Sequence, residues 1–397
     1  MNNLLKLFLI LTIFFVLVDP GNLIFGLKEI SLFLLFVIWL GDLIIKRSQL
    51  KFSKSLLIHL LLFSFVIPIT VFFSGYYGNS LFKLADGLQY IKAFLFTLTV
   101  FIVIERRFDF YKYFSYVSLT VALISIYLYF SIEKFSLNDN YYFVIKNAAF
   151  ISRRAFGDIL LDPVIFYKTS PLLIISLSYF CELFFLKLYG FSWRRLFSFI
   201  SILLLTTTLI ISGTRANWIC TFLIIVVFVG IYFRTRNRNN FHIYIISLLF
   251  LCILIVPPFL KKTIFTKTEE SNAIKINHLN SYITHFKQNP RYLIIGQGFG
   301  TYFYSKGVKE LTQQTELTYL EIIRMMGIPI ALMFLFLLIW PVFSLINSFD
   351  VKNFGLIFSY LLYLFEIGTN PLLFGSTGML VFVLILSKLY EGRYVKD

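Results

Sequence analysis

Charged residues are scarce in this chain of 397 residues. Lys, Arg, Asp and Glu together make up 14% of it, against roughly 25% in an ordinary soluble domain. Hydrophobic residues make up 58%, and the mean hydropathy is +0.82. This composition excludes an ordinary soluble protein and predicts an integral membrane protein.

Cysteine and histidine are also rare. The three cysteines, Cys181, Cys220 and Cys252, fall singly in apolar runs, and the four histidines are not clustered. No spacing typical of a disulfide framework or a metal site is present, and the sequence has no Asp-x-Asp motif. We therefore predict no disulfide, no metal site and no cofactor.

What the chain has in abundance is long apolar runs, and runs of this length are typical of transmembrane helices. We predict an all-α, polytopic membrane protein with about twelve transmembrane helices, forming a single integral membrane domain over residues 1–397. The first run ends at Asp-Pro-Gly without a cleavage signature, so we expect an uncleaved first helix. The predicted spans are 4–18, 27–45, 55–73, 87–104, 114–130, 171–186, 196–211, 216–233, 241–257, 318–346, 354–368 and 372–389.

Basic residues exceed acidic ones, giving a formal net charge of +16. They lie between the apolar runs and form no single patch, which argues against a nucleic-acid partner. Short loops rich in Lys and Arg alternate with loops that have almost none, so the positive-inside rule predicts that both termini are cytoplasmic. The basic loops contain Lys46, Arg47, Lys51 and Lys54, then Arg106, Arg107 and Lys112, then Lys187, Arg194 and Arg195, then Arg234, Arg236 and Arg238, and finally Lys352.

Two loops are long, and both fall on the predicted outer side: residues 131–170 and 258–316. Together they contain thirteen Lys and Arg residues against eight acidic residues. An outer surface with a positive balance suits an anionic ligand, although most of these lysines need only be solvated.

Arg215 stands at a predicted membrane boundary, in the stretch Ser-Gly-Thr-Arg-Ala-Asn-Trp at residues 212–218. Apolar runs flank it on both sides. An ionisable group costs at least about 2.5 kcal/mol toward the centre of a transmembrane helix and less near its edge. Arg215 is therefore a functional-site hypothesis, with an anionic ligand as its expected partner.

Three alternate glycines, Gly296, Gly298 and Gly300, follow Asn-Pro-Arg in the second long loop. No βαβ unit surrounds them, so they do not form a dinucleotide-binding motif. One interpretation is a tight turn that brings backbone close to a helix. The other is a floor whose backbone N–H groups receive a sugar or phosphate.

The tenth span begins near Glu316, in Thr-Glu-Leu-Thr-Tyr-Leu-Glu-Ile at residues 315–322. A carboxylate in the first turn of a helix suits the helix dipole, and it could also serve as a general base. Glu321 and Arg324 are three residues apart on one helix, and we expect them to pair.

The order of these motifs resembles the superfamily of O-antigen polymerases and O-antigen ligases, which are bacterial inner-membrane glycosyltransferases. The resemblance covers roughly residues 196–389, from the Ser-Gly-Thr-Arg stretch through Ile-Gly-Gln-Gly-Phe-Gly and Thr-Glu-Leu-Thr-Tyr to Asn370-Pro371 before the last span. It implies a C-type glycosyltransferase architecture in the inner membrane, with two large periplasmic loops and a periplasmic active site.

The resemblance implies a polymerase of repeat units carried on undecaprenyl pyrophosphate. Ligases of this superfamily typically have a histidine where this chain has Thr315-Glu316, and this departure favours the polymerase. His278 and His285 do not match that position. The product would be O-antigen or a related surface polysaccharide. A chain-length regulator protein is a candidate partner.

The expected reaction inverts the anomeric carbon and is independent of metal, because the lipid pyrophosphate is already an activated leaving group. In this hypothesis Arg215 stabilises the diphosphate and Glu316 is the general base on the acceptor hydroxyl. The candidate substrate-binding residues are Arg153, Arg154, Arg291, Gly296, Gly298 and Tyr319.

Two alternatives remain open. An O-antigen ligase would transfer the glycan to lipid A–core, and a flippase would move lipid-linked oligosaccharide across the membrane. A flippase is expected to carry charges along a central path. Residues that could line such a path lie near the predicted spans, and we favour paired structural roles for them: Lys28, Glu29, Asp86, Lys92 and Glu366.

Overall fold

The structure is a computed structural model that describes residues 2–21, 26–46, 52–78, 81–131, 149–156, 159–187, 192–236, 270–347 and 353–391. Most of these residues are helical. Within them, seven helical segments are long and apolar enough to cross a membrane, as the low charge content predicts. These are Lys54–Gly78, Leu84–Glu105, Phe110–Ser131, Ser170–Lys187, Trp193–Ile211, Arg215–Arg234 and Thr318–Asn347.

Several of the long segments are built from consecutive helical pieces that differ in their hydrogen-bonding period. The helices before the first hairpin are α1 Asn2–Val18, α2 Leu27–Lys46, α3 Lys54–Leu61, η1 Leu62–Val66, α4 Ile67–Gly78, α5 Leu84–Leu95, η2 Phe96–Leu98, α6 Thr99–Glu105 and α7 Phe110–Ser131. Those after it are η3 Ser170–Leu172, α9 Leu173–Cys181, η4 Glu182–Lys187, α10 Trp193–Ile211, α11 Arg215–Arg236, α13 Glu270–Gln288, α14 Tyr292–Ile295, α15 Thr318–Asn347, α16 Phe354–Ile367 and α17 Ser376–Glu391.

A helix occupies each of eleven predicted spans, and the twelfth, 241–257, lies outside the described residues. Not all eleven reach the length of a full crossing. Two of them, α1 and α16, are apolar but have only 17 and 14 residues. A total of about twelve crossings therefore stays a prediction.

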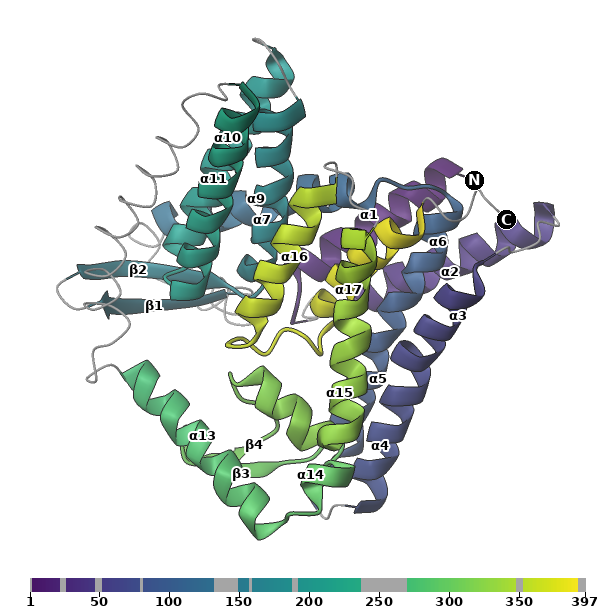
Figure 1. Ribbon diagram of the computed structural model, residues 1–397, viewed down its shortest axis with the longest axis vertical. Helices are drawn as coiled ribbons and strands as arrows, with labels where there is room; N and C mark the ends of the chain where they lie inside the picture. Colours follow the sequence, from purple (N-terminus) through teal and green to yellow (C-terminus); the bar gives the residue numbers. More distant parts are fainter. Residues whose placement is uncertain are drawn as a thin grey trace.

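The prediction of an all-α chain is wrong in one respect, because both long loops contain an antiparallel hairpin. In the first, β1 Ala149–Phe156 pairs with β2 Ile159–Tyr167, from Ala149 opposite Tyr167 to Phe156 opposite Ile159. In the second, β3 Phe303–Ser305 pairs with β4 Glu310–Thr312. Figure 1 shows this second hairpin beside α13 and α14, at the end of the bundle where α15 begins.

Two helices form the centre of the bundle. All nine residues of α9 are buried, and α17 is buried along almost its whole length. A helix that is apolar on every side is expected inside a bundle of other helices. The packing leaves both ends of α17 next to loops from other parts of the chain.

The helix α15 is bent at Gly327, whose φ of 69° and ψ of 163° are not helical. Only glycine adopts this conformation readily. The chain therefore forms a first helical segment up to Met326 and a second one after Gly327. The first segment carries Tyr319, Glu321 and Arg324 away from the axis of the second.

Candidate functional site

The glycine loop, residues 296–300, packs closely against three helices. Gly296, Gly298 and Gly300 all have positive φ, of 72°, 90° and 73°. A Cβ atom on any of them would overlap backbone atoms of other elements: Met325, Gly75 and Gly87 respectively. The loop is thereby pressed against α15, α4 and α5.

The backbone N–H groups of this loop are already engaged. Gly296 N–H donates to the carbonyl oxygen of Tyr292 at 3.1 Å, and Gly298 N–H donates to that of Met325 at 2.9 Å. The geometry thus favours the tight-turn interpretation over a ligand-binding floor. The predicted contact of Gly296 and Gly298 with substrate stays a prediction.

We expect Gly298→Ala to remove most of the folded protein from the membrane. The substitution combines a positive φ with backbone overlap, which together cost more than about 3 kcal/mol. The matched control is Gly41→Ala in α2, where an added Cβ meets nothing within 4 Å. Fluorescence-detected size exclusion of tagged protein measures the difference, and equal monodisperse yields of the two variants would contradict the packing role.

A buried ion pair lies next to the glycine loop. Arg324 is fully buried and pairs with Glu321, as their spacing predicts. Arg324 also donates to Thr301 Oγ1 at 3.1 Å and to the carbonyl oxygen of Gln313 at 2.8 Å. The Tyr282 hydroxyl donates to Glu321. Because these groups satisfy one another, the pair has a structural role that joins α13 and the glycine loop to α15.

His285 takes part in the same packing. Its ring stacks on that of Tyr292, with 5.4 Å between ring centroids. Burial lowers the pKa of His285 to about 4. The imidazole is therefore uncharged at neutral pH.

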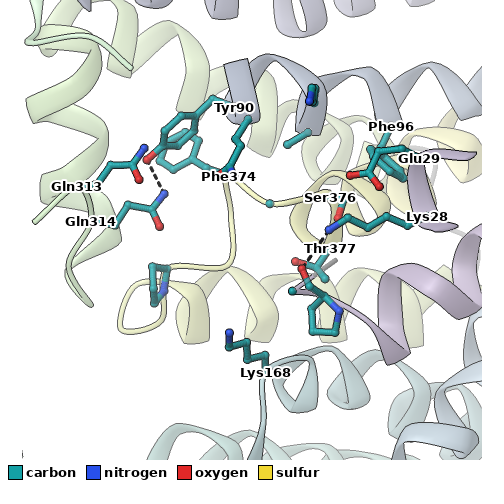
Figure 2. Close-up of a pocket in the computed structure, with 17 residues that line it drawn as sticks. Lys28, Glu29, Tyr90, Phe96, Lys168, Gln313, Gln314, Phe374, Ser376 and Thr377 are labelled. Atoms are coloured by element: carbon teal, nitrogen blue, oxygen red, sulfur yellow. Dashed lines mark hydrogen bonds between the residues drawn. The ribbon is translucent and has the colours of Figure 1, made fainter. Parts of the chain in front are cut away.

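A polar cavity of about 470 Å³ lies between the start of α2, the second half of α5 and the start of α17, and we call it the lysine cavity (Figure 2). Among the described residues, three lysines line it against one carboxylate, that of Glu29. Lys28 is 8% exposed and donates from Nζ to the carbonyl oxygen of Pro20 at 3.1 Å. Lys168 is half-buried, and this burial lowers the pKa of its ammonium group. The third lysine, Lys92, is exposed.

Amides, hydroxyls and aromatic rings complete the wall of the lysine cavity. Gln314 Nε2 donates to the Tyr90 hydroxyl at 2.6 Å, and Ser376 and Thr377 come from the first turn of α17. The Tyr90 ring stacks on Phe299 at 4.5 Å between centroids and meets Phe374 edge-on. A surplus of ammonium groups beside hydrogen-bonding groups can bind an anionic ligand that also carries hydroxyl groups.

Neither of the two predicted catalytic residues lines the lysine cavity, and both contact α13. Arg215, the first residue of α11, donates from Nη1 to Asn272 Oδ1 at 3.3 Å. Glu316 is half-exposed, and its carboxylate lies 3.7 Å from Lys275 Nζ. Asn272 and Lys275 are three residues apart and share one face of α13. Arg215 and Glu316 therefore contact neighbouring positions of the same helix, α13.

The turn before Arg215 is held by a buried carboxyl group. Glu366 in α16 is fully buried. With its amide nitrogen turned toward α16, Asn217 donates to both carboxylate oxygens of Glu366. In the same orientation the Asn217 amide oxygen accepts from Ser212 at 2.8 Å and from Thr214 at 2.6 Å. The polar residues of the 212–218 stretch thus fix the turn from which Arg215 projects.

Two of the remaining predicted substrate-binding residues, Arg291 and Tyr319, do not line the lysine cavity. Arg291 is exposed and lies over the ring of Tyr292 at 5.1 Å. The Tyr319 hydroxyl donates to the carbonyl oxygen of Leu364 in α16. Arg153 and Arg154 lie on β1, where the strand register shifts, and their side chains lie outside what the structure describes.

The sequence interpretation gave Lys28, Glu29 and Lys92 paired structural roles and did not foresee that they share a cavity. Lys28 and Glu29 stand in the first turn of α2, and Lys92 stands in the last turn of α5, so each one looks like an ordinary residue of a helix end. One feature of the sequence could have indicated the shared cavity: all three residues lie at the same predicted side of the membrane.

Comparisons with protein-family models, curated proteins and solved structures found no match to this chain. The functional argument therefore rests on the residues and their geometry.

Proposed function

We propose that this protein is a membrane glycosyltransferase that polymerises oligosaccharide repeat units carried on undecaprenyl pyrophosphate. The reaction takes place at the periplasmic face of a bacterial inner membrane and makes O-antigen or a related surface polysaccharide. The observation that carries the proposal is the lysine cavity together with the contacts of Arg215 and Glu316 on α13, in a chain whose motif order resembles that of the polymerase and ligase superfamily.

The position of the lysine cavity supports a periplasmic site. Four loops that the charge pattern predicts to be outside contribute to its wall, and their contributions are Pro20, Lys168, Gln314 and Pro371. Segments far apart in the sequence thus meet at one predicted face of the membrane.

Residues of the cavity wall connect the lysine cavity to Glu316 and to the turn that carries Arg215. Gln314 lines the cavity and precedes Glu316 by two residues. Lys168 lines it as well and precedes Ser170 by two residues, and the Ser170 hydroxyl lies 3.4 Å from the side-chain amide of Asn217. One extended substrate could therefore contact the lysines and Arg215 together.

Two neighbouring cationic sites suit a polymerase, because donor and acceptor both carry a lipid diphosphate. In our mechanism Arg215 holds the diphosphate of the donor, and the lysine cavity holds that of the acceptor. The acceptor hydroxyl attacks the anomeric carbon from the side opposite the leaving group. The glycosidic C–O bond to the donor diphosphate breaks, undecaprenyl diphosphate leaves, and Glu316 takes the hydroxyl proton.

Deletion of the gene tests the proposal. We expect surface polysaccharide chains that carry a single repeat unit on a gel, and a plasmid copy should restore the ladder. Free polymer that never reaches lipid A would indicate a ligase instead. Loss of every lipid-linked unit from the outer leaflet would indicate a flippase.

Charge changes in the lysine cavity should act in opposite directions on the acceptor KM. A hydrogen bond to a charged group contributes about 1.5–3 kcal/mol, so we expect Lys92→Gln to raise the KM about tenfold or more. Glu29→Gln removes the one carboxylate of the wall and should lower it. Assays in membrane vesicles with purified lipid-linked repeat units measure both. Equal KM values in the two variants would remove the cavity from the acceptor site.

A further inference from the structure

A second cavity, of about 380 Å³, lies at the other end of α17. Ser376 and Thr377 at the start of α17 line the lysine cavity, whereas Ser387 and Lys388 near its end line the second one. Eleven residues of helix between them span roughly 16 Å. We call this second space the α6–α7 cavity, because the turn between those helices forms one of its walls.

The rim of the α6–α7 cavity carries four cations, Arg107, Lys112, Lys187 and Lys388, against the carboxylates of Asp109 and Glu391. Both of these carboxylates have partners. Asp109 Oδ1 accepts from the backbone N–H of Lys112 at 3.1 Å, and Glu391 pairs with Lys388 at 2.7 Å. Lys187 pairs with Glu182 at 2.7 Å. Ion pairs offset the charges of Lys187 and Lys388, so the remaining net positive charge of the rim comes from Arg107 and Lys112, with Asp109 between them in the sequence.

Arg107 occupies a backbone position that glycine usually fills. Its φ is 51°, at the C-terminal end of α6. Its N–H donates to the carbonyl oxygen of Ile104, and the N–H of Phe108 donates to that of Val103. Glycine is preferred at such a helix end because it has no Cβ. An arginine there places a guanidinium on the rim at the expense of backbone strain, which is a pointer to function.

The floor of the α6–α7 cavity is apolar, in contrast to its rim. It is lined by Val103, Ile104, Phe110, Leu183, Leu356 and Leu384. Three of the segments that supply these residues, Leu84–Glu105, Phe110–Ser131 and Ser170–Lys187, are long and apolar enough to cross a membrane. A cationic rim above an apolar floor suits an amphiphile with an anionic headgroup better than a small soluble anion.

We propose that the α6–α7 cavity binds an anionic phospholipid, with the phosphate at Arg107 and Lys112 and the first part of an acyl chain against the apolar floor. Basic pockets between transmembrane helices bind the headgroups of anionic lipids in this way. The inference does not depend on the proposed glycosyltransferase activity.

The test measures lipid retention by native mass spectrometry on the full chain, released from nanodiscs of phosphatidylcholine mixed with phosphatidylglycerol. The wild type should retain phosphatidylglycerol and not phosphatidylcholine. Arg107→Gly removes the guanidinium and relieves the backbone, so this variant is expected to fold. Each lost charge should reduce retention about fivefold, and the Arg107→Gly/Lys112→Gln double variant about twenty-five-fold.

Two further variants separate charge from folding. Lys54→Gln is the matched control: Lys54 is exposed outside the cavity, and its neighbour Ser55 contacts Tyr390 near the end of α17. It should leave retention unchanged, and Arg107→Lys should keep most of it. Equal retention by the double variant and the wild type would overturn the proposal. So would equal retention of the two lipids, or complete displacement of phosphatidylglycerol by inorganic phosphate alone.

Discussion

Replacing Arg215 with Ala is expected to abolish polysaccharide longer than one repeat unit while leaving the amount of protein in the membrane unchanged. In the proposed mechanism the guanidinium stabilises the charge that develops on the diphosphate as the glycosidic bond breaks. Loss of one such electrostatic contact costs about 10²–10³-fold in kcat. The Arg215 guanidinium donates a long hydrogen bond to Asn272, and the turn that carries it is fixed by the side chains of Asn217 and Glu366. The variant should therefore fold.

The control for Arg215→Ala is Arg194→Ala, which removes an exposed arginine in the first turn of α10, at the opposite end of that helix from the 212–214 turn. It should leave the ladder of chain lengths intact. Arg215→Lys keeps the charge but loses the planar fork, so an intermediate ladder is expected. Wild-type chain lengths from Arg215→Ala would remove the residue from the site and with it the central element of the mechanism.

The long apolar helices could be predicted because a crossing of hydrocarbon requires a certain length and composition of each segment. The first long loop had no comparable signal. Its hairpin depends on the pairing of β1 with β2, which periodicity in a short, mixed stretch does not specify. The bend in α15 was more accessible, since Gly327 followed by Pro329 marks a helix boundary.

Local spacing also decided which part of the site could be foreseen. The pairing of Glu321 with Arg324 follows from their three-residue separation and is confirmed. Their contacts with Tyr282 and Thr301 depend on how the glycine loop and α13 fold back on α15, and no nearby residues encode them. The lysine cavity was missed for the same reason, because it joins charges from separate helix ends.

The second large expected effect is the loss of turnover when Glu316 is replaced. Replacing it with Gln keeps the volume of the side chain and removes the base, so turnover should fall about 10²–10⁴-fold. Binding of the lipid-linked donor should remain, because in our mechanism the donor diphosphate is held by Arg215. Single-turnover assays in vesicles measure the chemical step, and retention of labelled donor measures binding.

Two companion variants decide whether Glu316 acts as a base or only through its ion pair with Lys275, 3.7 Å away. Lys275→Gln breaks the pair but leaves the carboxylate, so it should retain most of the activity if Glu316 is the base. Glu310→Gln removes an exposed carboxylate from the neighbouring strand β4 and should be neutral. A Lys275→Gln defect as large as that of Glu316→Gln would show that the pair positions α13, and the proton of the acceptor hydroxyl would then need another acceptor.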